Sequence, residues 1–571
     1  MKSTFLFILS VCLFFSCKPG KQKADLIIHN AVVYTLDSDF SITDAIAIKD
    51  DKILATGNFE ELLSLYDATE KTDVHGKFIY PGFIDSHCHF YGYGMGLQEI
   101  NLVGTKSFKE VIERIVEFTN VHEKEEWIIG RGWDQNDWEV KEYPDNKLLD
   151  SLFPNTPVLI TRIDGHAALA NSTALKRAGI NKKTFVNGGE LLFIKQTETS
   201  KNLSVSKSES KKDASLSGIL IDNAVDLVTK VIPQRPEEKI KKALMDAQAN
   251  CFAVGLTTVD DAGLLKSQID IIDQMQKQDK LKIRVYAMLS DSSVNYDHYL
   301  KNAPPSERVA WGKYKTDFLN VCSFKFYGDG ALGSRGACMK KDYADKIAWR
   351  GFLLYPIEHY TEKGELLKAH GFQMNSHSIG DSSLKVFVDL YGKESVKNLR
   401  WRIEHCQIVS SDELPKFKEY GIIPSVQPTH ATSDMYWAEN RIGKERLKTA
   451  YAFKDLLSAA GLIALGTDFP VEDISPFKTF YAAVFRKDAN GFPKGGFQIE
   501  NALSREEAIK GMTIWGAYAN FEEKEKGSLE KGKFADLIIL DTDLLKCEEE
   551  KVLKTKVIAT YIGGKIVYSY K

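Results

Sequence analysis

The middle of the chain alternates between short apolar runs and longer stretches with apolar residues at helical spacing. Runs such as "KIRVYAML", "WRIEHCQI" and "LIALGTDFP" are separated by segments such as "PEEKIKKALMDAQANCFAVG". Strands that alternate with helices favour a parallel sheet, because a crossover segment must return the chain between parallel strands. Eight such strands are found when the run that ends at Asp85 is counted as the first. We therefore predict an α/β fold built on a (β/α)8 barrel.

The two ends of the chain differ from this middle. Residues 24–78 and 525–571 consist of short β-like segments separated by polar turns. We predict that they pair into one small β-sandwich domain and that the barrel occupies residues 79–524. A long insertion, at about residues 97–233, follows the first barrel strand. Within it, residues 197–218 are rich in serine and lysine, which is typical of a mobile loop.

The first residues have the composition of an export signal. Lys2 is followed by the apolar run "FLFILSVCLFFS" and then Cys17. The run is shorter than the roughly 20 residues that span a bilayer. Because "LFFSC" resembles a bacterial lipobox, we predict a lipoprotein signal at residues 1–16, lipidation of Cys17 and a linker at residues 17–23. The protein would then be exported and held on the membrane by lipid alone, facing the periplasm. An ordinary cleaved signal with an incidental cysteine is the alternative.

The charge balance argues against nucleic acid as a partner. The chain has 75 lysines and arginines against 78 aspartates and glutamates, a net charge of −3. A slightly acidic protein lacks the basic surface that attracts phosphate backbones. We expect a small-molecule substrate, and the sequence is compatible with a homodimer.

Histidines stand at the ends of several predicted strands. In "DSHCH", His87 and His89 are two residues apart, so they project to the same face of a strand together with Asp85. Two neutral imidazoles aimed at one point form half of a zinc coordination sphere. Two histidines in this arrangement, taken by themselves, could also be strand residues that only form hydrogen bonds. His377 and His405, however, end the fifth and sixth strands, and the ends of barrel strands meet at one face. A metal site is therefore predicted there.

Two further residues at strand ends have a less certain role from the residues alone. Lys325, in the fourth strand, shares a face with Tyr327 and Asp329. A buried ammonium is costly unless paired, so a Lys325–Asp329 ion pair competes with a carbamate that bridges two metals. Asp468, in the eighth strand, is placed to accept a proton from metal-activated water, or to cap the helix that follows.

Five motifs together resemble the amidohydrolase superfamily. They are "DSHCH", "FKFYGDG", "NSHSIGD", "RIEHCQ" and "GTDFPV". The similarity is closest to the amidohydrolase family 3 branch, which includes N-substituted formamide deformylase-like proteins. "GRGWDQNDW" and "RIDGHAALANSTAL" extend it, so that it covers the chain after the signal. The resemblance implies a TIM-like metal-dependent hydrolase barrel with a β-sandwich formed by both termini.

The resemblance also implies roles for individual residues. The implied ligands of one or two divalent ions, expected to be zinc, are His87, His89, Lys325 as N-carboxylysine, His377, His405 and Asp468. Asp468 is also the implied catalytic acid and base. The residues implied to line the substrate pocket are Trp133, Asp134, His166, Asp329, Arg335 and His430. Hydrogen bonding to other site residues is the alternative for the two histidines, and core packing is the alternative for the tryptophan.

The activity expected from this set is hydrolysis of a carbon–nitrogen bond. Metal-activated hydroxide would attack an amide-type bond of a small N-acyl or N-formyl compound. A lipid-anchored binding protein with an inactive barrel is one alternative. A deaminase or esterase that uses the same metal site is another, because the metal chemistry does not determine the leaving group.

Overall fold

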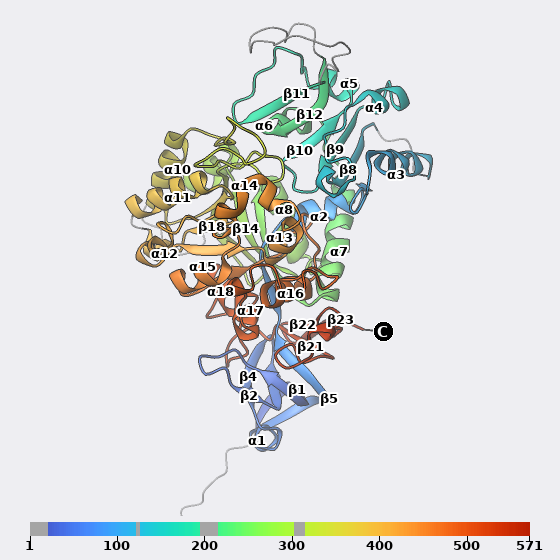
Figure 1. Ribbon diagram of the computed structural model, residues 1–571. Helices are drawn as coiled ribbons and strands as arrows, with labels where there is room; N and C mark the ends of the chain where they lie inside the picture. The colour runs from blue at the N-terminus through green and yellow to red at the C-terminus, as the bar shows by residue number, and fades with distance from the viewer. Residues whose placement is uncertain (1–20, 122–125, 195–214, 302–313, 395, 571) are drawn as a thin grey trace, which may run out of the picture.

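The computed structural model describes residues 21–121, 126–194, 215–301, 314–394 and 396–570. The predicted signal with Cys17 and most of the serine- and lysine-rich tract lie outside the described residues, so these remain predictions. Figure 1 shows a central barrel with the insertion at one end and a sheet built from both ends of the chain at the other. Within the described ranges, none of the helices has the length and apolar character needed to cross a bilayer.

The barrel consists of eight parallel strands that pair in chain order, which confirms the predicted fold class. The strands are β6 (Phe83–Cys88), β13 (Leu256–Leu264), β14 (Arg284–Ser290), β16 (Leu319–Tyr327), β17 (Gln373–Ser378), β18 (Arg402–His405), β19 (Ile423–Val426) and β20 (Ala464–Leu465). The last and first strands meet at their C-terminal ends, where the backbone N–H of Asp468 donates to the carbonyl of His87 at 2.7 Å. The strand ends therefore surround one common opening.

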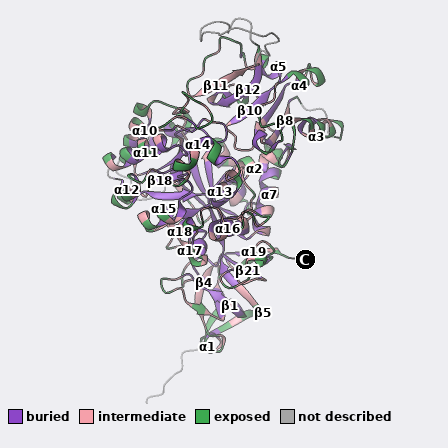
Figure 2. Cartoon of the chain, viewed as in Figure 1, coloured by how far each residue is buried: buried purple, intermediate pink, exposed green. Residues whose placement is uncertain are grey.

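Helices cover the outside of the barrel. Those that connect or follow its strands are α7 (Glu237–Ala253), α8 (Lys266–Lys277), α9 (Ser293–Tyr296), α10 (Ile357–His370), α11 (Asp381–Glu394), α12 (Leu414–Tyr420), α13 (Pro428–Asp434), α14 (Ala438–Leu447), α15 (Phe453–Ala460), α16 (Pro476–Phe485), α17 (Arg505–Gly511) and α18 (Ile514–Ala519). In α8, for example, Ile269, Ile272 and Met275 form the buried face, as their spacing dictates. Figure 2 shows the resulting pattern of buried strands and exposed outer helix faces.

Glycines determine where three of these helices end. Gly371, Gly421 and Gly461 follow α10, α12 and α15 and have φ angles of 71°, 70° and 86°. This left-handed conformation terminates a helix and costs glycine little, because glycine has no Cβ. Each glycine stands just ahead of the next barrel strand, so the sequence itself places these helix-to-strand turns.

Both ends of the chain contribute to one continuous sheet. Its strands are β1 (Gln22–Tyr34), β2 (Ile42–Thr43), β3 (Ala45–Lys49), β4 (Lys52–Gly57), β5 (Tyr66–Pro81), β21 (Leu537–Leu540), β22 (Val557–Ile562) and β23 (Lys565–Ser569), with α1 (Phe59–Leu65) and α19 (Glu549–Val552) beside them. The central strand β5 runs parallel to β1 and antiparallel to β21. Arg284, at the start of β14, forms a bidentate ion pair with Asp536 at 2.5 and 2.9 Å. The terminal sheet therefore contacts the N-terminal ends of the barrel strands, opposite the predicted site.

The insertion forms a sheet of its own between β6 and β13. Its order is β11-β12-β10-β9-β8-β7, and its elements are β7 (Ile100–Asn101), β8 (Ile128–Trp133), β9 (Val158–Arg162), β10 (Ala167–Ala170), β11 (Gly189–Phe193), β12 (Leu216–Asp222), α2 (Phe90–Gly96), α3 (Phe108–Val121), α4 (Lys147–Leu152), α5 (Ser172–Arg177) and α6 (Asn223–Thr229). It has its own hydrophobic core, which includes Trp133 and Trp138. Because it leaves the barrel at the end of β6, it lies over the C-terminal face (Figure 1).

Candidate active site

A cavity of about 750 Å³ lies at the C-terminal ends of the barrel strands. The barrel contributes Lys325, His377 and Asp468 to its wall, and the insertion contributes Arg131 and His166. A concave site built from strand ends of a parallel barrel is where the active centres of such barrels lie. The insertion therefore forms part of the cavity wall.

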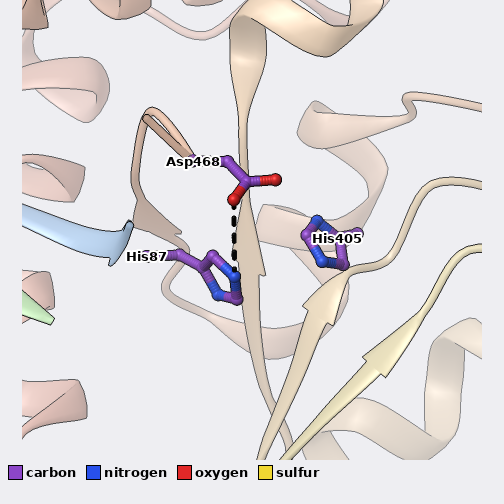
Figure 3. Close-up of side chains that lie close together, drawn as sticks. All are labelled: His87, His405 and Asp468. Carbon is purple, nitrogen blue, oxygen red and sulfur yellow. Dashed lines mark ion pairs between the residues drawn. The ribbon is translucent and has the colours of Figure 1, made fainter. Parts of the chain in front are cut away.

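The predicted metal ligands converge in this cavity. His87 from β6, His405 from β18 and Asp468 from the loop after β20 each offer a ligand atom, and these atoms lie within 4.8 Å of one another (Figure 3). The ring centre of His377 is 4.5 Å from that of His405. His89 Nε2 is 3.2 Å from Asp468 Oδ1. His87 and His89 come from the end of β6, His377 and His405 from β17 and β18, and Asp468 from the loop after β20, so side chains from four parts of the barrel lie close together.

Acceptors on the protein hold three of these rings through their Nδ1 atoms. The contacts are His87 Nδ1 to Glu404 Oε2 at 2.5 Å, His89 Nδ1 to the carbonyl of Ala262 at 3.1 Å, and His405 Nδ1 to Gln427 Oε1 at 2.7 Å. Each ring donates from Nδ1, so its Nε2 is left unprotonated and available to a cation. Fixing the tautomer through the far ring nitrogen is the usual arrangement behind metal-binding histidines.

The charge state of the cluster fits a divalent cation. Burial lowers the pKa of His87 to about 4 and lowers the pKa values of His377 and His405 well below the usual range. Burial by itself would raise the pKa of Asp468, but His89 and His87 beside it bring that pKa well below its ordinary value. Neutral imidazoles and a carboxylate are the protonation states that zinc-type ions require. The donor set therefore fits the metal that the sequence predicts.

A buried ionic network holds His87 through the Nδ1 side of its ring. Arg402 donates to Glu404 at 2.8 and 3.1 Å and to Asp260 at 2.9 Å, and all three side chains are fully buried. Asn520 donates to the other oxygen of Asp260 at 2.6 Å. Burial opposes ionisation of Glu404, yet Arg402 and His87 hold the pKa of Glu404 well below its usual range. Glu404 is therefore a carboxylate that orients His87, and sequence reasoning missed it.

Two of the candidate ligands have strained backbones. His405 has a φ of 72° and Asp468 a φ of 62°, values that residues with a Cβ rarely adopt. In β18 the alternation of a strand places Arg402 and Glu404 on the inner face, and the turn at His405 brings its ring to the cavity as well. Backbone conformations of this kind are kept only where the surrounding structure enforces them, and they are typical of functional sites.

Lys325 lies against the cluster rather than against Asp329. Its Nζ is 3.2 Å from His87 Nε2, and burial lowers its pKa to about 8. Among the described residues it forms no ion pair, whereas Asp329 accepts backbone N–H groups from Cys338 and Gly380 at 2.8 Å each. The alternative Lys325–Asp329 ion pair is thus not formed.

Asp85 ties the first strand to the last rather than facing the cluster. Its two oxygens accept the backbone N–H and the hydroxyl of Thr467 at 2.9 and 2.6 Å. Burial raises the pKa of Asp85 to about 7. Gly466 makes the contact possible, because a Cβ at that position would lie 2.5 Å from the backbone nitrogen of His87. Asp85 thereby positions Asp468, one residue beyond Thr467.

Three of the six predicted pocket residues line the cavity. They are Asp134, His166 and His430. His166 donates from Nδ1 to Asp222 at 2.7 Å, and His430 Nε2 is 3.6 Å from Asp468 Oδ2. Asp222, which the sequence did not single out, has an unusual φ of 50°.

The other three predicted pocket residues lie outside the cavity wall. Trp133 is fully buried in the insertion core and donates from Nε1 to the carbonyl of Ile160 at 2.9 Å. Asp329 organises backbone, as described above. Arg335 forms a bidentate pair with Asp345 at 3.0 and 2.9 Å and lines a separate cavity. Trp133 and Arg335 are held by partners from neighbouring segments and point away from the site, whereas Asp329 Oδ1 lies 3.5 Å from Nε2 of His377, behind the cavity wall.

The fold and the cluster together define a metal-dependent hydrolase barrel, and the comparisons with known proteins agree. A sequence profile of the amidohydrolase family matches residues 70–568. The chain therefore belongs to the amidohydrolase family.

Similar proteins cover nearly the whole chain. Protein LONG AFTER FAR-RED 3 of Arabidopsis thaliana is 30% identical over 96% of this chain and 92% of its own length. N-substituted formamide deformylase of Arthrobacter pascens is 24% identical over 96% of this chain and 99% of its own. A crystal structure of an uncharacterized metal-dependent hydrolase from Pyrococcus horikoshii OT3 superposes with a TM-score of 0.70 and 28% identity, covering 92% and 99% of the two chains.

Proposed function

We propose that this chain hydrolyses the amide-type carbon–nitrogen bond of a small N-acyl or N-formyl compound. The observation that carries the proposal is the convergence of His87, His405 and Asp468 within 4.8 Å, with His405 and Asp468 lining the cavity and His87 buried beside them. One relative of nearly equal length is an N-substituted formamide deformylase, which supports the choice of bond. A divalent ion held here, which we propose to be zinc, would lower the pKa of a coordinated water and polarise the substrate carbonyl.

Asp468 is the group that we propose moves the proton. It lines the cavity, and its neighbours keep it ionised, so it can accept a proton from the attacking water. It then transfers that proton to the departing nitrogen. The oxygen of water bonds to the carbonyl carbon, the carbon–nitrogen bond breaks, and a carboxylic acid and an amine result. His430, 3.6 Å from Asp468 Oδ2, limits the orientations of the carboxylate.

Lys325 is proposed to be a carbamate in the active protein. Its neutral amine would add to carbon dioxide and lose a proton, which turns a potential cation beside His87 Nε2 into an anion. A cationic amine at that distance would repel a divalent ion, and no protein carboxylate in the described ranges pairs with it. The resulting carbamate would become a sixth ligand.

Carbamylation of Lys325 can be detected directly by NMR. Protein equilibrated with ¹³C-bicarbonate should show a carbamate resonance by NMR, and K325M should lack this resonance and bind less metal. K363M serves as the control, because Lys363 is partly buried yet lies outside the cavity wall. A resonance that persists in K325M, or is missing from the native protein, would rule out the modification.

The proposed reaction is tested with zinc-loaded protein and a panel of N-formyl and N-acyl amines. Amine and acid should be released in equal amounts, a chelator should abolish the release, and added zinc should restore it. The matching esters and amidines should be tested in parallel. Hydrolysis of those compounds without hydrolysis of any amide would show that the cluster serves a different reaction.

A further inference from the structure

One arginine of the cavity wall has no anionic partner among the described residues. Arg131, in β8 of the insertion, lines the cavity, and its side chain makes a single hydrogen bond, from Nη2 to the carbonyl of Ile163 at 2.9 Å. Its Nε is buried without a partner, and the guanidinium forms no ion pair in the described part of the chain. Burial lowers its pKa. A guanidinium removed from water without a counter-charge is unfavourable in free energy, so the site favours an anion from outside the protein.

Apart from Lys325, which the proposed carbamate would turn into an anion, the other charged groups of the inner wall already have partners among the described residues. Arg162 binds Asp134 at 2.5 Å and also Asp164. The carboxylates that face inward accept hydrogen bonds from the protein, namely Asp222 from His166, Asp261 from the N–H of Tyr91, Asp291 from His359, Asp434 from Tyr451 and Glu472 from Ser433. Asp137 and Asp226 are exposed to solvent at the rim. None of these acidic residues therefore forms an ion pair with the guanidinium of Arg131.

A second unpartnered donor lies in the same cavity next to the metal cluster. The hydroxyl of Tyr327 forms no hydrogen bond within the described ranges, and its ring centre is 5.7 Å from that of His377. Tyr327 belongs to barrel strand β16, whereas Arg131 belongs to the insertion. Two free donors from different parts of the fold therefore face one space.

We propose that Arg131, assisted by the hydroxyl of Tyr327, binds a carboxylate group of the substrate. The substrate class is then an amide that also bears a carboxylate, such as an N-formyl or N-acyl amino acid; this inference rests on the proposed hydrolysis. A planar guanidinium matches the two oxygens of a carboxylate, and such charge-assisted pairs are stronger than neutral hydrogen bonds. The insertion would thus select the substrate while the barrel cleaves it.

A matched pair of compounds tests the proposal. N-formylphenylalanine and N-formylphenethylamine differ only in the carboxylate, and the native protein should have the higher kcat/KM for the acid. R131Q should lower the ratio of acid to neutral kcat/KM by about 10- to 100-fold, and Y327F should lower it by a smaller factor. R177Q is the matched control, because Arg177 is an exposed arginine of the insertion that pairs with Glu126 and does not line the cavity. It should leave the ratio unchanged.

Binding by calorimetry separates this inference from the proposed reaction. If neither compound is hydrolysed, the proposed function fails, yet tighter binding of the acid that disappears in R131Q would still support the carboxylate site. The inference is overturned if the native protein shows no preference for the acid in turnover or in binding. It is equally overturned if R131Q retains that preference.

Discussion

Replacing Asp468 by asparagine is expected to lower kcat by about 10²- to 10⁴-fold, the range for loss of a positioned general acid or base. Asparagine keeps a ligand oxygen and the shape of the side chain, but it cannot accept a proton. Because His87 and His405 remain, with His89 and His377 close by, the variant should still bind metal. Steady-state kinetics and metal analysis on the same sample measure both quantities.

D473N is the control for this variant. Asp473 lies five residues further along the same loop, pairs with Lys478 at 2.7 Å and does not line the cavity. Its replacement should leave kcat and metal content near the native values. If D468N retained full turnover with metal bound, a different group would have to carry the proton, and the mechanism proposed for Asp468 would be wrong.

Replacing Arg402 by methionine is expected to cost about 3–5 kcal/mol of stability, the range for breaking a buried ion pair by removing one partner. Methionine leaves Asp260 and Glu404 buried without their shared cation. The pKa of Glu404 should then rise, because Arg402 is a main cause of its low value. A protonated Glu404 holds His87 less firmly, so metal affinity should fall by about 10- to 100-fold. Urea denaturation of metal-free protein and a metal titration measure these two effects.

An exposed arginine provides the comparison. Arg350 pairs with Asp342 at 2.7 Å, but its side chain is 62% exposed. R350M should therefore change stability by no more than about 1 kcal/mol. Equal losses in R402M and R350M would mean that the buried network contributes nothing beyond an ordinary surface pair.

The location of the metal cluster was predictable from the sequence. "DSHCH", "NSHSIGD", "RIEHCQ" and "GTDFPV" each follow an apolar run, and the alternation of strands with helices leaves few arrangements other than a parallel barrel. In a barrel the strand ends converge whatever the rest of the chain does. Residues far apart in the sequence therefore meet because of periodicity alone, and His87, His405 and Asp468 do meet.

The partners of those residues were harder to predict. Glu404 stands beside His405 in "RIEHC", and its alternation with Arg402 was a usable signal for an inward-facing pair. Its contact with His87 depends on the distance between β18 and β6 across the barrel, which no local pattern specifies. Neither Asp222 nor Arg131 was singled out, although Arg131 stands in "GRGWDQNDW", because a single charged residue at the end of a strand is common on any surface.

The sequence by itself determined the order of strands and helices, the turns at Gly371, Gly421 and Gly461, and the ring of ligands at the strand ends. These features depend on local periodicity and backbone preference. Only the tertiary structure decided that Trp133 and Arg335 point away from the cavity and that Arg131 points into it. The direction of such a side chain depends on which charged or apolar groups a segment distant in the sequence places next to it. Those contacts form only when the insertion packs over the barrel.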